Sequence, residues 1–189
     1  MRFIAASLIF IAVLGCAMAS AAERVQNSER IAELLAQDQM DRKGFPNTAL
    51  SWKEINVRDE ARREEILSML KEGKVRTGQD YYYSAVIFHH GQTDDHYRLA
   101  ASLAWIAATI EPENKDYLWQ TASTWDRFMV KRGRPQWYGI QPKINDEGEV
   151  EGRYQIDEGA VTDEERARYQ VRPLAEIREL KNGSARVDP

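Results

Sequence analysis

The chain has 189 residues, of which 43% are hydrophobic and 30% are charged, with a formal net charge of −4 and one cysteine. That length suits a single domain with a core of its own, and an acidic chain without a basic tail argues against a nucleic-acid partner. A single cysteine cannot form an intramolecular disulfide, so the stability of the fold has to come from packing.

The first 22 residues have the pattern of a signal peptide, in which a basic start precedes an apolar run from Phe3 to Leu14. This run is too short for a comfortable transmembrane span. Ala19-Ser20-Ala21 fits ordinary cleavage and predicts a periplasmic or secreted protein. In the alternative, the sequence before Cys16 is a lipobox, and only lipidation of Cys16 would then bring the chain to a membrane.

Apolar residues at helical spacing, with capping residues before them and glycines after them, predict five helices in the first 132 residues. The predicted helices span about 28–42, 59–72, 81–90, 93–110 and 113–132. Gly44 is expected to stop the first helix, and Asp59 and Asp80 to cap the second and third. Trp52 is expected in a polar linker at the edge of the core, and the charged stretch 60–65 indicates a solvated face.

The fourth helix is apolar nearly all round, which predicts that it is central and buried. The pattern then changes to partial alternation over 136–144 and 150–156, with a turn signature at 145–148 between them. This arrangement predicts a β-hairpin.

The sequence at 162–165 has the pattern of a capping box, and Pro173 favours the start of a last helix from Leu174 to about Lys181. We therefore expect a mainly α, compact multi-helix domain over residues 23–183, with one β-hairpin near its C-terminal third. Residues 184–189 are expected to form a flexible tail.

His90 is the sharpest candidate for chemistry, because on a helix it shares a face with Val86 and Ile87 and should point inward. It is either a core histidine with one hydrogen bond or a general base beside a carboxylate. His89, His90 and His96 lie near two aspartates, but their spacing matches no metal-binding pattern. We expect neither a metal nor another cofactor.

Asp126 and Arg127 form the second candidate, at the margin of the apolar stripe of the fifth predicted helix. Asp126 makes either a structural ion pair, with Arg127 or with an arginine from another helix, or a group in which it orients His90, as a carboxylate does in a hydrolytic dyad. No G-x-S-x-G motif accompanies them, and the sequence after Cys16 contains no further cysteine that could act as a nucleophile.

The segment from Pro135 to Gln141 places two amides around two aromatic rings, just after a helix end. It is either a helix-to-hairpin junction with buried rings or the wall of a ligand site. In the second case Gln136, Trp137, Tyr138 and Gln141 would bind the ligand, because aromatic rings stack and amides hydrogen-bond in the way that suits a sugar or a peptide.

Six different short motifs lie along the chain between about Leu34 and Leu180. They are Asp38 with Asp41-Arg42, Asp59 with Arg62, Ala85 to Gly91, Asp126-Arg127, Gly133 to Gln141, and Asp163 with Arg166 before Val171 and Leu174. Together they resemble a bacterial domain family of unknown function. That family shows D-x-x-D-R, D-x-x-R, A-x-I-x-Q-H-G, D-R, G-x-x-Q-x-Y-G-T-Q and D-x-x-R before V-x-x-L.

Two positions depart from the family pattern, since His89 stands where glutamine is usual and Ile140 where threonine is usual. The resemblance implies a mostly helical domain and no particular activity. It also singles out one polar group, namely His90, Asp126, Arg127, Gln136, Tyr138 and Gln141.

Two functions follow from the sequence. The first is an exported binding or interaction domain without catalysis, whose partner is an unidentified small molecule or protein. The alternative is a hydrolase-like enzyme in which His90 is the base and Asp126 orients it, while Arg127, Gln136 or Gln141 contacts the oxyanion or the substrate. The enzyme hypothesis requires His90 and Asp126 to lie within hydrogen-bond reach.

Overall fold

The computed structural model describes residues 26–43, 49–145, 149–180 and 186. Within these ranges the fold is mainly helical with one antiparallel β-hairpin in the C-terminal part, which confirms the predicted fold class. In chain order the elements are α1 (Glu29–Asp41), α2 (Trp52–Lys71), α3 (Gly78–His89), α4 (Asp94–Ile110), α5 (Lys115–Lys131), β1 (Pro142–Ile144), β2 (Val150–Arg153), α6 (Asp163–Arg168) and α7 (Leu174–Glu179). No helix in the described ranges is long and apolar enough to cross a membrane.

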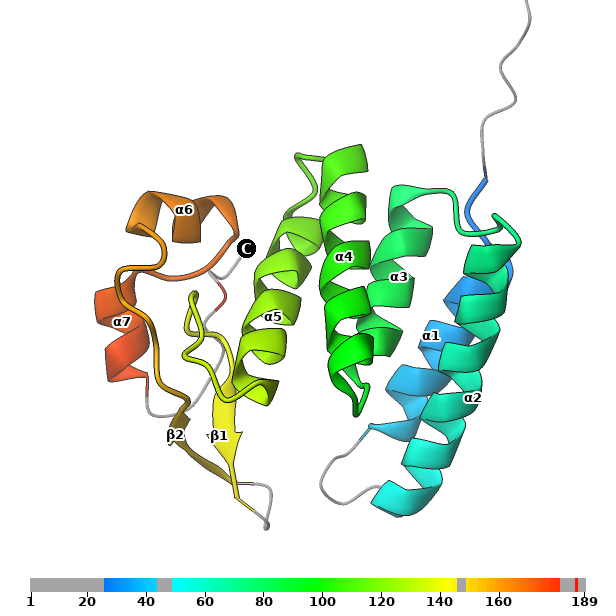
Figure 1. The fold of residues 1–189 in the computed structure, drawn as a ribbon, viewed down its shortest axis with the longest axis horizontal. Coiled ribbons are helices and arrows are strands. Elements are labelled where there is room, and N and C mark those ends of the chain that lie inside the picture. The colour runs from blue at the N-terminus through cyan, green and yellow to red at the C-terminus, as the bar shows by residue number, and fades with distance from the viewer. Residues whose placement is uncertain (1–25, 44–48, 146–148, 181–185, 187–189) are drawn as a thin grey trace, which may run out of the picture.

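The elements follow one another across the molecule, with α1 and α2 at one end and the hairpin, α6 and α7 at the other (Figure 1). Between them α4 packs against both α3 and α5. The buried apolar residues form two clusters. The first contains residues of the four helices α1, α2, α3 and α4, and the second contains residues of α5 and of the segments that follow it. The second cluster positions the segment 135–141 against α5.

The start of α2 differs from the prediction. Ser51 caps it with a capping box closed by Glu54, so the helix begins at Trp52 rather than near Asp59. Trp52 is therefore the first helical residue, and it is 53% exposed instead of filling the edge of the core. Asp59 is buried inside the helix, because its carboxylate has arginine partners there.

Other helices also depart from their predicted bounds or surroundings. Thr77 caps α3 and Asp80 closes its capping box, while Asn114 caps α5. The predicted solvated face at 60–65 contains two buried residues, Arg62 and Arg63. The prediction that α4 is buried all round is wrong, because one face remains open, as shown by Trp105 at 59% exposed.

The hairpin is shorter than predicted, since β1 and β2 pair only from Pro142 opposite Arg153 to Ile144 opposite Val150. Outside the two strands, Gln136 and Ile156 form an isolated parallel β-bridge. Within the predicted tail, Arg186 pairs with Val171. Several predictions fall outside the described residues: the signal peptide at 1–22, the stop at Gly44, the turn residues 146–148, and the rest of the tail.

Candidate functional site

His90 and Asp126 do not pair, although the enzyme hypothesis requires it. The Nδ1 atom of His90 lies 3.0 Å from the Oδ1 atom of Asp38 on α1. The two carboxylate oxygens of Asp126 accept hydrogen bonds from the backbone of the segment 135–141 instead. The polar group predicted from the sequence is therefore divided between two networks.

The first network, here called the charge network, comprises Asp38, Asp41, Arg42, Arg58, Asp59, Arg62 and His90. Its centre is the buried carboxylate of Asp59, which pairs with Arg42 and with Arg62, the latter at 2.6 Å. Arg42 reaches on to Asp38 at 2.9 Å, and Asp38 holds His90. Cations and carboxylates thus alternate between α1, α2 and the end of α3, which satisfies charges that burial would otherwise make costly.

His90 is the C-cap of α3 rather than an inward core residue, and its side chain is 21% exposed. The histidine that lies in the interior is its neighbour His89. Burial holds the pKa of His89 well below its ordinary value, and the nearby charges of Arg127 and His90 lower it further. The prediction that His90 points inward on a helix face is wrong, because α3 ends at His89 and His90 lies beyond the last helical residue.

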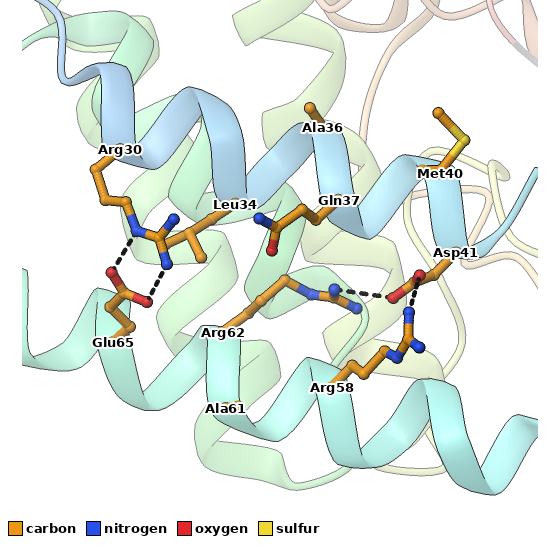
Figure 2. A pocket seen from close by; sticks show the side chains of 10 residues that line it. All are labelled: Arg30, Leu34, Ala36, Gln37, Met40, Asp41, Arg58, Ala61, Arg62 and Glu65. Atoms are coloured by element: carbon orange, nitrogen blue, oxygen red, sulfur yellow. Dashed lines mark hydrogen bonds and ion pairs between the residues drawn. The ribbon is translucent and has the colours of Figure 1, made fainter.

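The charge network borders an open groove of about 670 Å³ between α1 and α2 (Figure 2). Asp41 spans it, accepting hydrogen bonds from Arg58 and Arg62 at 2.9 Å each. Nearer the other end Arg30 and Glu65 pair at 2.6 Å. These charged side chains pair with one another across the groove, and the pairs link α1 to α2.

Acid is expected to weaken the charge network through Asp38. Burial alone would raise the pKa of Asp38, but the hydrogen bond from His90 and the charges of His90 and Arg42 lower it below the ordinary value. A lowered folded-state pKa contributes stability above the unfolded pKa of about 3.9, and this stability is lost as the pH falls through the folded value. Urea unfolding should therefore show Asp38→Asn less stable than wild type at pH 7, with a gap that closes below about pH 4. A gap that stays constant down to pH 3 would contradict this.

Arg127 does not pair with Asp126, although the two residues are adjacent on α5. Its Nε atom is buried without a hydrogen-bond partner among the described residues, and burial lowers the pKa of its guanidinium. Asp126 faces the segment 135–141 instead. The predicted ion pair between Asp126 and Arg127 is therefore wrong.

The second network, here called the loop network, is built on Asp126. Its Oδ1 atom accepts the amides of Trp137 at 2.8 Å and Tyr138 at 3.0 Å, and its Oδ2 atom accepts the amide of Ile140 at 2.9 Å. Burial raises the pKa of Asp126 to about 6, against the opposing effect of these backbone hydrogen bonds. One carboxylate thereby fixes the path of a segment that has no regular secondary structure of its own.

The turn in this segment requires a glycine. Gly139 has a φ of +86°, which side-chain-bearing residues rarely adopt. A Cβ atom there would also lie 2.9 Å from Ile156 and 3.0 Å from Ile177. The glycine lets the amides on either side of it turn toward Asp126 while the loop packs on the second core cluster.

Gln136 and Gln141 serve the same segment from inside the protein. The Gln136 side chain donates to the carbonyls of Gln141 at 3.2 Å and Tyr154 at 2.9 Å, and accepts the amide of Gln141 at 2.7 Å. Gln141 donates in turn to the carbonyl of Ser123 on α5 at 3.0 Å. Both amide groups are buried and engaged by backbone groups, as expected for a helix-to-hairpin junction.

Arg166 on α6 is a member of the loop network that the sequence did not predict as a site residue. It is almost fully buried and donates to the carbonyls of Val161 at 2.9 Å and Trp137 at 3.0 Å. Its position in the last D-x-x-R motif was the available signal. Through Arg166 the segment 135–141 is held by α6 as well as by α5.

A pocket of about 270 Å³, here called the aromatic pocket, lies where α4, α5, α6 and this segment meet. Its lining residues are Ala101, Trp105, Thr121, Trp125, Trp137, Tyr138, Glu165 and Tyr169. Trp137 and Tyr138 were predicted as ligand contacts, whereas Trp105, Trp125, Glu165 and Tyr169 were not. Periodicity alone cannot find them, because at helical spacing an aromatic residue is as suited to a core as to a pocket.

The rings in the pocket stand at steep angles to one another. Trp125 and Trp137 have centroids 4.8 Å apart and planes 59° apart, and Tyr138 and Tyr169 are 5.3 Å apart at 63°. The pocket adjoins a depression of about 410 Å³ along α4 and α5, with which it shares Trp105 and Trp125. The open face of α4 is therefore part of a hollow lined with aromatic rings.

The described residues include no group of three or more histidines, cysteines, aspartates or glutamates arranged to hold a metal ion. No family model matches the chain, and no curated protein or solved structure does so either. The resemblance to a bacterial domain family therefore stays a prediction.

Proposed function

We propose that this chain is an exported, non-catalytic binding domain whose ligand site is the aromatic pocket. Export rests on the signal-peptide pattern of residues 1–22. The observation that supports the site is that aromatic side chains from α4, α5, the segment 135–141 and the residue after α6 line a single pocket. A concave apolar surface with few polar groups is the usual form of a small-molecule site.

The loop network supports this proposal, because it gives the pocket a rigid wall. Trp137 and Tyr138 have their backbone amides bound by Asp126, and the carbonyl of Trp137 is bound by Arg166. A wall fixed before binding costs little entropy when a ligand arrives. The polar residues predicted as direct ligand contacts, Gln136 and Gln141, would then act on the ligand only by holding that wall.

The alternative prediction, a hydrolase-like enzyme built on His90 and Asp126, receives no support from the contacts. His90 lies in the charge network with Asp38, and Asp126 lies in the loop network. A pair that shares no contact cannot act as base and orienting carboxylate in one reaction. We therefore propose the binding function and not the hydrolase-like one.

Trp105→Ala is expected to weaken binding at this pocket without unfolding the protein, because Trp105 lines the pocket yet is 59% exposed. Isothermal titration with a panel of small organic cations, sugars and short peptides should give at least one ligand that binds wild type. Trp105→Ala should weaken that ligand at least about tenfold, a loss of about 1.4 kcal/mol.

Trp52→Ala is the matched control, since Trp52 is 53% exposed and lies on α2, outside the pocket. It should bind the same ligand as tightly as wild type does. Equal affinity of Trp105→Ala and wild type for every ligand found would place the site elsewhere and overturn the proposal.

A further inference from the structure

The aromatic pocket is small in comparison with the sites that bind drug-sized ligands. Its volume is about 270 Å³, while sites for such ligands measure about 300–1,000 Å³. Its walls present tryptophan and tyrosine rings in different orientations, with interplanar angles of 59° and 63° within the two pairs. The two rings of each pair contact each other and are not parallel, so they offer no single flat surface for a planar ligand and suit a compact rounded group better.

The charge of the lining favours a cation. Glu165 is the sole charged residue among the described residues that line the pocket, and it accepts a hydrogen bond from the hydroxyl of Tyr138 at 3.1 Å. The faces of tryptophan and tyrosine rings are themselves electron-rich and attract cations. Arg168 lies over the ring of Tyr169, 5.8 Å from its centroid, so that ring already has a cation within the protein and a cationic ligand is left with the tryptophan rings.

Apart from the indole N–H groups of its tryptophans, of which that of Trp125 is buried without a hydrogen-bond partner among the described residues, the pocket offers few groups that could bind a sugar or a primary amine. The hydroxyl of Thr121 is already used by the carbonyls of Ala104 and Tyr117, at 3.2 Å and 2.9 Å. The amides of Gln136 and Gln141 are buried and engaged by the backbone. Sugar hydroxyls need several such partners, and a primary ammonium group has three N–H bonds to satisfy. A quaternary ammonium group has none, so it loses nothing in this lining.

We infer that the aromatic pocket binds the trimethylammonium group of a small solute, with the rings of Trp105, Trp125 and Trp137 around the methyl groups and Glu165 near the charge. The inference deepens the proposed function and rests on it, because it names the ligand class of the same site. Two independent features support it, the aromatic faces that line a small pocket and the single carboxylate among the described lining residues.

The test compares choline chloride with 3,3-dimethylbutan-1-ol, which has the same shape as choline but carries no charge. Isothermal titration of the purified protein should show choline binding, with the neutral analogue at least about tenfold weaker. Glu165→Gln keeps the shape of an exposed side chain and should weaken choline by about tenfold. Trp105→Ala should do the same, and Trp52→Ala should leave the affinity unchanged.

Each contrary outcome has a definite meaning. Equal binding of the neutral analogue, or unchanged choline affinity in Glu165→Gln, would overturn the inference while the proposed binding function stands. The same holds if choline fails to bind but another ligand binds wild type and is lost in Trp105→Ala. Binding to phosphatidylcholine vesicles without binding of free choline would replace the small solute by a lipid headgroup. Absence of binding by choline and by the whole panel would overturn the proposed function as well.

Discussion

Asp126→Asn is expected to lower the free energy of unfolding by about 2–4 kcal/mol. The wild-type carboxylate accepts three backbone amides with its two oxygens. Asparagine keeps one oxygen for Trp137 and Tyr138 but replaces the other with an NH₂ group that faces the amide of Ile140. A buried donor then meets a donor, and the charge-assisted character of the remaining bonds is lost. Urea denaturation at pH 7 measures the effect.

The matched control is Asp95→Asn on α4, where the side chain is 80% exposed and pairs with Arg98. An exposed ion pair of this kind contributes about 0–1 kcal/mol, so the control should change stability little. Similar losses in the two variants would show that the backbone hydrogen bonds of Asp126 add nothing beyond an ordinary surface carboxylate. The prediction would then be wrong, and the rigid wall of the aromatic pocket would need another explanation.

The helices could be predicted because their signals are local. Apolar spacing and caps lie within a few residues of one another, so the positions of α1, α4 and α5 agree with the prediction within two residues at each end. The start of α2 was missed for a local reason as well. Asp59 has the side chain of a cap, but Ser51 and Glu54 form the stronger capping box eight residues earlier.

The partners of buried charges could not be predicted, because they depend on residues far apart in the chain. His90 and Asp38 are separated by 52 positions, and nothing near either residue distinguishes Asp38 from Asp126 as the partner. Asp126 was expected to need a cation, yet three backbone amides satisfy it. A buried carboxylate requires donors, but the sequence does not specify whether side chains or the backbone supply them.

The aromatic pocket was predicted in part for the same reason. Trp137 and Tyr138 stood out because they follow a helix end within a short polar segment. Trp105 and Trp125 lie inside helices, where each fits an apolar stripe, and only the packing of α4 beside α5 leaves them lining a hollow. The segment 135–141 was thus identified from the sequence, while the opposite wall required the fold.

The charge network gives the second large effect, since Asp59→Leu is expected to destabilise the protein by about 3–5 kcal/mol. The carboxylate of Asp59 is buried and serves both Arg42 and Arg62. Removing it leaves two neighbouring guanidinium groups that repel each other, one of them buried. The exposed neighbour Glu60 provides the control on the same helix, and Glu60→Leu should change stability by no more than about 0.5 kcal/mol.

Removing the buried cation as well should restore much of this loss. In the double variant Asp59→Leu/Arg62→Leu, no unpaired charge is left at the centre, because Asp41 keeps Arg58 as a partner at 2.9 Å. Replacing a buried ion pair by apolar residues is often nearly neutral, whereas breaking it is costly. The double variant should therefore be more stable than Asp59→Leu alone, with a coupling energy of at least about 1 kcal/mol. Losses that simply add would show that Asp59 and Arg62 act independently, and His90 would then sit beside a network with no cooperative structural role.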